Sequence, residues 1–390
     1  MSNAIFQTHY DSLSNLIRSI GDRSSAVRAE AELDGLMLAG EESVAIAEQS
    51  LTEPESEETV AAATLVAFAL QAITLYPKVL NILCGENSEF QTGARLGLRL
   101  SNIGPIIREL LGLVGDSQPK ARIAILDVLS FHRVQVPGDV HGLLKIEEPE
   151  TRCVLLDSLG RSGNASLVAS FSQDTDPQIK KAFWKAMARS GHPQVVDACR
   201  QRCAEHQPCH DAIRFLGVIA DPNDFSLLRK LATHEGTAVA ALEAMGHCGV
   251  TELIPNILAA LNVPLTADAA ARSLERISGR MVPRSDPPPP PDHLTEDELD
   301  FWSHPGDPIP EAAHQWWKQN HYYFETGKRY QAGRCVSDDP LGPIFDELPD
   351  EIRRDVYLRE RALHFDKTPD WELETWLRYQ RNSKWASHSL

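Results

Sequence analysis

An apolar pair recurs at a nearly constant interval through the middle of the chain, and this repeat constrains the fold more than any other feature. The pairs are Leu126/Leu129, Leu156/Leu159, Trp184/Met187, Ile213/Leu216, Leu242/Met245 and Ala271/Leu274. Their second members follow one another at steps of 28 to 30 residues. A unit of this length cannot bury an apolar face alone, so successive units must stack on one another.

Each unit is expected to contain two helices. Proline stands ten residues before the second apolar anchor in four units, at Pro119, Pro149, Pro177 and Pro264. Proline suits the first turn of a helix, where its missing N–H has no intrahelical partner in any case. Second segments such as residues 222–234 ("PNDFSLLRKLATH") carry apolar residues at helical spacing. The sequence therefore predicts an all-α fold, an α-solenoid of two-helix repeats.

Four segments are predicted along the chain. Residues 1–110 continue the helical pattern less regularly and are expected to supply the first units and a cap, and residues 111–281 are the regular repeats. Residues 282–294 form a Pro-rich linker. Residues 295–390 hold 15 of the 26 Phe, Trp and Tyr residues. Disordered tails are poor in aromatic residues, so this segment is predicted to be a small, folded, partly helical appendage.

The repeats resemble the short HEAT-like repeats of bacterial proteins over residues 88–280. The resemblance rests on proline at the helix start, on the apolar pair followed by small residues, and on a basic residue three positions after the proline, as in Arg122, Arg152 and Lys180. Such a likeness implies a fold much more than an activity.

The C-terminal segment carries a second resemblance. It contains a W-W…F-x-x-G-x-R-Y-x-x-G phrase formed by Trp316, Trp317, Phe324, Gly327, Arg329, Tyr330 and Gly333. This phrase, placed after helical repeats, is similar to an uncharacterised proteobacterial HEAT-repeat family whose genes often lie near type VI secretion clusters. The resemblance implies a cytoplasmic accessory of that toxin-delivery machine, and it offers no active site to carry over.

Net charge and composition limit the classes of partner that the protein is expected to bind. The formal net charge is −17, which disfavours binding to nucleic acid phosphates and favours a basic protein partner. Seven scattered cysteines suit a reducing cytoplasm. The most apolar stretch, residues 60–76, is shorter than the roughly 20 residues that a membrane span needs, so it is predicted to be a buried helix. The start of the chain does not resemble a secretion signal. We expect a cytoplasmic protein that binds neither membranes nor nucleic acid.

Two groups of residues are candidates for partner binding. The aromatic group consists of Trp316, Trp317, Tyr322, Tyr323 and Tyr330. We expect these side chains mainly to pack within their own domain, with a partner anchor as the alternative. The basic group, on the second helices of the central repeats, consists of Arg200, Arg202, Arg229 and Lys230. This local strip could instead hold an acidic segment of a partner.

The densest set of metal-ligating residue types is Cys199, Cys203, His206, Cys209 and His210. Zinc is bound by such residues. Cys199 and Cys203 stand one helical turn apart on an apolar face, however, so they are predicted to be small buried residues, and no metal or cofactor is expected. The His234–Glu235 pair resembles those of the di-iron HEAT-repeat hydroxylases, but the equivalent positions of the other repeats lack ligands. No catalytic residue is predicted.

The sequence therefore favours a non-catalytic protein–protein interaction scaffold, namely an adaptor or chaperone associated with type VI secretion. One alternative is an immunity-type protein that binds and occludes a toxin. A weaker alternative is a metal-dependent enzyme that uses the Cys/His cluster.

Overall fold

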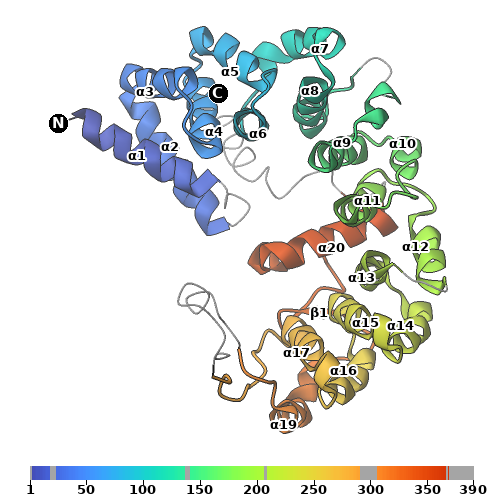
Figure 1. The fold of residues 1–390 in the computed structure, drawn as a ribbon. Helices are drawn as coiled ribbons and strands as arrows, with labels where there is room; N and C mark the ends of the chain where they lie inside the picture. Colours follow the sequence, from blue (N-terminus) through green and yellow to red (C-terminus); the bar gives the residue numbers. More distant parts are fainter. Residues whose placement is uncertain are drawn as a thin grey trace. The chain divides into compact units, whose positions relative to one another are not determined.

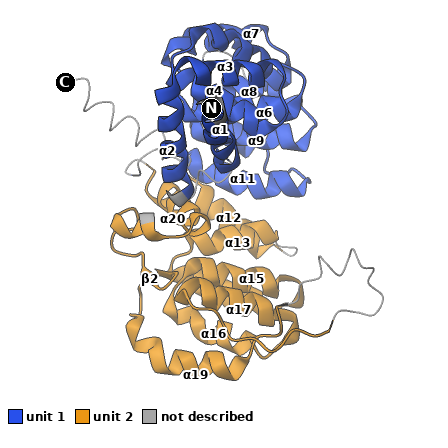
Figure 2. Cartoon of the chain, turned by 90° about the vertical axis from the view of Figure 1, so that its left-hand side faces the viewer, with its two compact units in different colours: residues 1–192, 367–390 blue, residues 193–366 orange. Residues whose placement is uncertain are grey.

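The computed structural model describes residues 2–17, 23–136, 141–205, 209–289 and 305–365, together with Thr368. These residues are predominantly helical (Figure 1), so the expectation of an all-α fold is confirmed. The chain divides into two compact units (Figure 2). Unit 1 comprises residues 1–192 with 367–390, and unit 2 comprises residues 193–366. The four segments expected from the sequence stay predictions.

Unit 1 is a succession of helices in which neighbours along the chain pack together. Its described helices are α1 (Ser2–Ile17), α2 (Arg23–Ala39), α3 (Glu41–Thr52), α4 (Glu57–Ala69), α5 (Tyr76–Leu83), α6 (Ser88–Leu100), α7 (Ile107–Asp116), α8 (Pro119–Phe131), α9 (Pro149–Arg161), α10 (Ala165–Ala169) and α11 (Pro177–Arg189). Short 3₁₀ turns lie at Ile73–Leu75, Gly104–Ile106 and His141–Lys145. Helices α4, α6, α8, α9 and α11 each contact the next, while α3, α5 and α7 pack against α4, α6 and α8.

Unit 2 continues the same pattern. Its repeat helices are α12 (Val195–Ala204), α13 (His210–Ile219), α14 (Phe225–Ala232), α15 (Glu235–Cys248), α16 (Ile254–Ala260) and α17 (Pro264–Ser278). The C-terminal part adds α19 (Pro310–Asn320), the 3₁₀ turns η6 (His321–Tyr323) and η7 (Pro343–Glu347), strands β1 (Tyr330–Gln331) and β2 (Arg334–Cys335), and α20 (Asp350–Leu363). Further 3₁₀ turns lie at η4 (Pro222–Asp224) and η5 (Thr251–Leu253). Helices α13, α15 and α17 contact one another in succession, and α12, α14 and α16 pack against them.

The local signals in the repeats explain these helices. All four predicted prolines begin a helix, at α8, α9, α11 and α17. All six apolar pairs are buried. The position after the anchor is small in five of the six units, and adjacent helices approach closely at its glycines. A Cβ added to Gly217 would lie 2.5 Å from the Ala244 Cα atom, so this crossing of α13 and α15 requires glycine.

The first part of the apolar stretch 60–76, predicted as a buried helix, lies in α4, whose residues 60–68 are all buried. The prediction is confirmed for these residues and wrong for the rest, because α4 ends at Ala69 and Ile73, in the following 3₁₀ turn, is 70% exposed. Among the residues that the structure describes, no helix combines the length and the apolar character needed to cross a membrane.

The backbone of the C-terminal segment runs across the carboxyl ends of the unit 2 helices. The Tyr330 N–H donates to the Gly249 carbonyl oxygen at 2.8 Å, just past α15. The Gly333 N–H donates to the Ile277 carbonyl oxygen at 2.9 Å, in the last turn of α17. The last carbonyl groups of a helix have no partner within it. Segment 329–333 therefore supplies hydrogen-bond donors that two successive helices need.

Side chains of the same segment complete this arrangement. The buried Arg329 guanidinium donates to the carbonyl oxygens of Ala220, just past α13, and of Cys248, at the end of α15. A positive charge is favourable at the carboxyl end of a helix. The Gln331 amide donates to the His247 carbonyl oxygen at 2.9 Å. Segment 329–333 is thus an integral part of unit 2.

Two left-handed glycines permit this close approach. Gly249 and Gly279 follow α15 and α17 with φ angles of 72° and 68°. A Cβ at Gly249 would lie 2.4 Å from the Tyr330 carbonyl oxygen, and one at Gly279 would lie 2.5 Å from that of Ala332. Any side chain at either glycine would therefore displace the segment as well as strain the turn.

Candidate functional site

The aromatic stretch lies on α19 and on the turn that follows it. Helix α19 begins at Pro310 and packs against α16. Trp316 and Trp317 are half-buried, and their rings lie 6.3 Å and 5.2 Å from the Phe324 ring. Tyr322 and Tyr323 are 65% and 64% exposed, with ring centroids 4.1 Å apart. We call Trp316, Trp317, Tyr322 and Tyr323 the aromatic patch.

Tyr330 does not belong to this patch. It is buried, its hydroxyl oxygen accepts the Glu325 N–H at 2.9 Å, and its ring meets the Phe324 ring edge-on at 4.8 Å. Packing within the domain is the preferred expectation for the whole stretch, with a partner anchor as the alternative. Tyr330 meets the preferred expectation, because its side chain lies in the interior of unit 2. Tyr322 and Tyr323 do not meet it, because they are exposed.

The predicted basic strip is also engaged within the chain. Arg200, on α12, pairs through Nε with Asp224 at 2.8 Å and through Nη2 with Asp221 at 2.6 Å. Hydrogen bonds to these two carboxylates, opposed by partial burial, raise the pKa of Arg200 above its usual range. Arg200 thus ties α12 to the turn after α13.

The other members of the strip lie closer to solvent. Arg202, on α12, pairs with Glu205, the residue that directly follows this helix. Arg229 donates to the Glu252 carbonyl oxygen at 3.1 Å. Lys230 is exposed in the last turn of α14. The charge that this strip offers to a partner is therefore smaller than the sequence suggests, and its role in binding remains a prediction.

The cysteine residues of the Cys/His cluster are packed as expected. Cys199 and Cys203 are buried, and the Cys199 thiol donates to the Ala212 carbonyl oxygen at 3.2 Å. The predicted burial of Cys199 and Cys203 is therefore confirmed. His210 lies 2.8 Å from the Gly236 carbonyl oxygen through Nε2, and His206 falls outside the described residues. In the part of the chain that the structure describes, no three His, Cys, Asp or Glu side chains gather closely enough to hold a metal ion.

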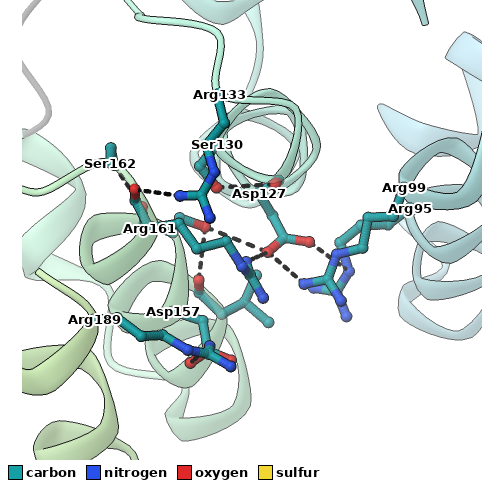
Figure 3. A network of polar contacts seen from close by, with 11 residues as sticks. Arg95, Arg99, Asp127, Ser130, Arg133, Asp157, Arg161, Ser162 and Arg189 are labelled. Atoms are coloured by element: carbon teal, nitrogen blue, oxygen red, sulfur yellow. Dashed lines mark hydrogen bonds and ion pairs between the residues drawn. The ribbon is translucent and has the colours of Figure 1, made fainter. Parts of the chain in front are cut away.

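A cluster that sequence reasoning missed lies in unit 1 (Figure 3). Asp127, on α8, is fully buried. Its carboxylate pairs with Arg99 at 2.6 Å, with Arg161 at 2.7 Å and with Arg95 at 3.4 Å. Arg95 and Arg99 are one turn apart on α6, and Arg161 ends α9, so the three helices α6, α8 and α9 meet at this point. We call these four residues the arginine cluster.

Burial and the close approach of charged groups shift the pKa values within the arginine cluster. Complete burial alone would raise the pKa of Asp127, but the charges of Arg99, Arg161 and Arg95 outweigh it and hold that pKa well below its usual range. Burial lowers the pKa of Arg95, and repulsion from Arg99 and Arg161 adds to that effect, while Asp127 opposes it. The cluster therefore stabilises one carboxylate strongly and holds more positive charge than that carboxylate neutralises.

A signal for the cluster was present in the repeat. Asp127 and Asp157 each follow the first member of an apolar pair, 30 residues apart in equivalent positions. Each pairs with an arginine of the following repeat: Asp127 with Arg161, and Asp157 with Arg189 at 3.1 Å. A carboxylate at a fixed position of a repeat can therefore indicate an ion pair between neighbouring repeats.

Unit 2 also contains a cavity of about 410 Å³. Its charged lining includes Arg329, Arg359, Asp221, Glu252 and Glu360. Burial, assisted by repulsion from Arg329, lowers the pKa of Arg359 to about 10. Both signs of charge face this cavity, so its chemistry favours no single class of ligand.

No protein-family model matches this chain, and neither does any curated protein.

Proposed function

We propose that this chain is a non-catalytic protein-binding scaffold, a HEAT-like α-solenoid with an aromatic-rich C-terminal segment. The observation that carries the proposal is the aromatic patch, in which the exposed Tyr322 and Tyr323 lie next to the half-buried Trp316 and Trp317. Tyr and Trp bury a large area at a low cost in conformational entropy, and they are enriched in interface hot spots.

The backbone that carries the aromatic patch is held in place by contacts within unit 2. Helix α19 packs against α16, and segment 329–333 is hydrogen-bonded to the ends of α15 and α17. A partner that binds Tyr322 and Tyr323 therefore meets side chains whose backbone is already ordered, which lowers the entropic cost of association.

The repeat architecture supports the solenoid part of the proposal. Neighbouring helices contact one another in sequence, and the pairs Asp127–Arg161 and Asp157–Arg189 link equivalent positions of adjacent repeats. Stacked repeats offer extended surfaces that are typically used for binding other proteins.

The cellular role that we propose is that of a cytoplasmic adaptor or chaperone associated with type VI secretion, with a secretion component or effector as its partner. Its support is the resemblance of the Trp316–Gly333 phrase to the HEAT-repeat family encoded near such clusters. The identity of the partner separates this role from inhibition of a toxin. A spike or baseplate protein supports the adaptor, whereas a toxin encoded beside the chain would overturn it.

The double substitution Tyr322→Ser/Tyr323→Ser is expected to weaken capture of the partner from a native lysate by about tenfold or more, because paired aromatic hot spots commonly contribute 2 kcal/mol or more. Quantitative mass spectrometry of the captured proteins gives the measurement. The melting temperature should not change, since both side chains are exposed.

Leu265→Ser provides the matched control. Leu265 is an exposed apolar residue on α17, outside the aromatic patch. Its substitution should leave capture intact. If the control and the double variant both captured less of the same protein, and by the same factor, a specific role for the aromatic patch would be contradicted.

A further inference from the structure

The arginine cluster holds more positive charge than the described carboxylate at its centre neutralises. In the neighbouring pair between repeats, one carboxylate, Asp157, meets one guanidinium, Arg189. At Asp127 three guanidinium groups surround one carboxylate. The short contacts of Arg99 and Arg161 both reach Oδ1 of Asp127, and Arg95 is the described guanidinium next to Oδ2. Among the described residues of the cluster, three positive charges therefore share one negative charge.

Arg95 is also the least engaged of the three. Its one ion pair with a described residue is the 3.4 Å contact between Nε and an Asp127 oxygen, which is long for a charge-assisted hydrogen bond. A guanidinium has five N–H donors. A partly buried guanidinium with so few acceptors among the described residues can gain from a further anion beside it.

Access to the cluster differs among its members. The side chains of Arg95 and Arg99 are 18% and 14% exposed, whereas that of Arg161 is 2% exposed. Figure 3 shows Arg95 and Arg99 reaching from one helix toward Asp127, opposite Arg161. Arg161 therefore fixes Asp127 from inside, and only Arg95 and Arg99 can meet a ligand from outside the chain.

We propose that Arg95 and Arg99 form a binding site for a second carboxylate, supplied by an acidic side chain of the protein partner. The inference rests on the proposed scaffold function and specifies the chemistry of the partner. The planar guanidinium matches a carboxylate in two parallel hydrogen bonds. A nucleic acid is disfavoured because the net charge of −17 repels a long run of phosphates.

The charged groups around the site support an anionic ligand. Besides Asp127, the acidic neighbour in the network is Asp157, which is paired with Arg189. Arg133 adds another guanidinium, which donates to the Arg161 carbonyl oxygen at 2.8 Å. The cluster is thus a local concentration of positive charge in an acidic chain, which attracts an acidic segment and fixes its position.

The test is titration calorimetry of the full chain with a short poly-glutamate peptide and, separately, with inorganic phosphate at low ionic strength. Wild type is expected to bind the peptide, with affinity that falls as salt is added. Arg95→Gln should weaken this binding about tenfold or more, the effect of losing a charged hydrogen bond. Asp127 keeps the two short pairs at its Oδ1 atom in this variant. The melting temperature of Arg95→Gln is measured alongside, and the loss of binding counts only if the variant is folded at the temperature of the titration.

Two further variants sharpen the result. Arg108→Gln removes the same charge from an exposed position on α7 and should leave peptide binding unchanged. Arg95→Lys keeps the positive charge but loses the paired N–H donors of the guanidinium. Its affinity for the peptide should therefore lie between those of Arg95→Gln and wild type.

Several outcomes would overturn the inference. They are the absence of peptide binding by wild type, equal losses in Arg95→Gln and Arg108→Gln, and phosphate binding that Arg95 controls without any peptide binding. The last outcome would identify the site as one for a free oxyanion. If any of them occurs while capture through Tyr322 and Tyr323 persists, the carboxylate site is wrong and the scaffold function stands.

Discussion

Replacing Asp127 with alanine is expected to lower the free energy of unfolding by about 3–5 kcal/mol, because removing one partner of a buried ion pair leaves uncompensated charge behind. Three guanidinium groups lose their shared counter-ion in this variant. They come from α6 and α9 and meet at α8, so the loss affects the packing of these three helices. Denaturant unfolding of the full chain, followed by circular dichroism, measures the change.

Asp116→Ala is the matched control for this variant. Asp116 is exposed at the end of α7 in the same unit, so its loss should change stability by less than about 0.5 kcal/mol. If Asp127→Ala were no less stable than Asp116→Ala, the arginine cluster would not be the joint between repeats that its geometry indicates.

The stability lost in Asp127→Ala should also depend on pH in one direction. The folded-state pKa of Asp127 lies well below its usual range, and the unfolded value is about 3.9. Stability from such a group is complete above the unfolded pKa and declines as the pH falls toward the folded pKa. The difference between wild type and Asp127→Ala should therefore be constant near neutral pH and narrow below about pH 4. A difference that widened on acidification would contradict the assignment.

The second large effect is expected at Tyr330. Truncation to alanine should remove about 3–5 kcal/mol, as for other large buried aromatic residues. Tyr330 is buried against Phe324, its hydroxyl accepts the Glu325 N–H, and its backbone caps α15. The cavity left by the ring would loosen the segment that satisfies the helix ends. For a unit of this size the melting temperature should fall by roughly 2–4 °C per kcal/mol.

Tyr323→Ala is the informative comparison for Tyr330→Ala. Both residues belong to the same aromatic stretch, but Tyr323 is largely exposed. Its truncation should leave the melting temperature unchanged and reduce partner capture. Equal stability of the two variants would mean that the buried and exposed parts of the stretch do not differ in role.

The sequence was most informative where a signal acts within one helix. Proline at the helix start and apolar residues at helical spacing are local, so α8, α9, α11 and α17 begin where the prolines stand. The burial of Cys199 and Cys203 followed from the same periodicity. Local propensity and burial pattern agree at these positions, which is what makes them predictable.

Contacts between distant residues were less predictable. The basic strip resembles a surface feature in the sequence because the partners of Arg200, Asp221 and Asp224, lie more than twenty residues later. Tyr330 lies in the same stretch as the exposed Tyr322 and Tyr323, but it packs against Phe324 and bonds through its backbone to Gly249, just past α15. The arginine cluster joins three helices, so no single segment reveals its surplus charge.

The most direct test of the scaffold function is site-specific photo-crosslinking through a photoreactive phenylalanine analogue at position 323, in cells that express the full chain at its native level. The same analogue at position 265, an exposed site on α17, serves as the comparison. The account predicts one discrete cross-linked protein from position 323 that is absent from position 265 and is lost in the Tyr322→Ser background. Cross-linking from position 323 that yields no protein adduct, or adducts identical to those from position 265, would contradict it.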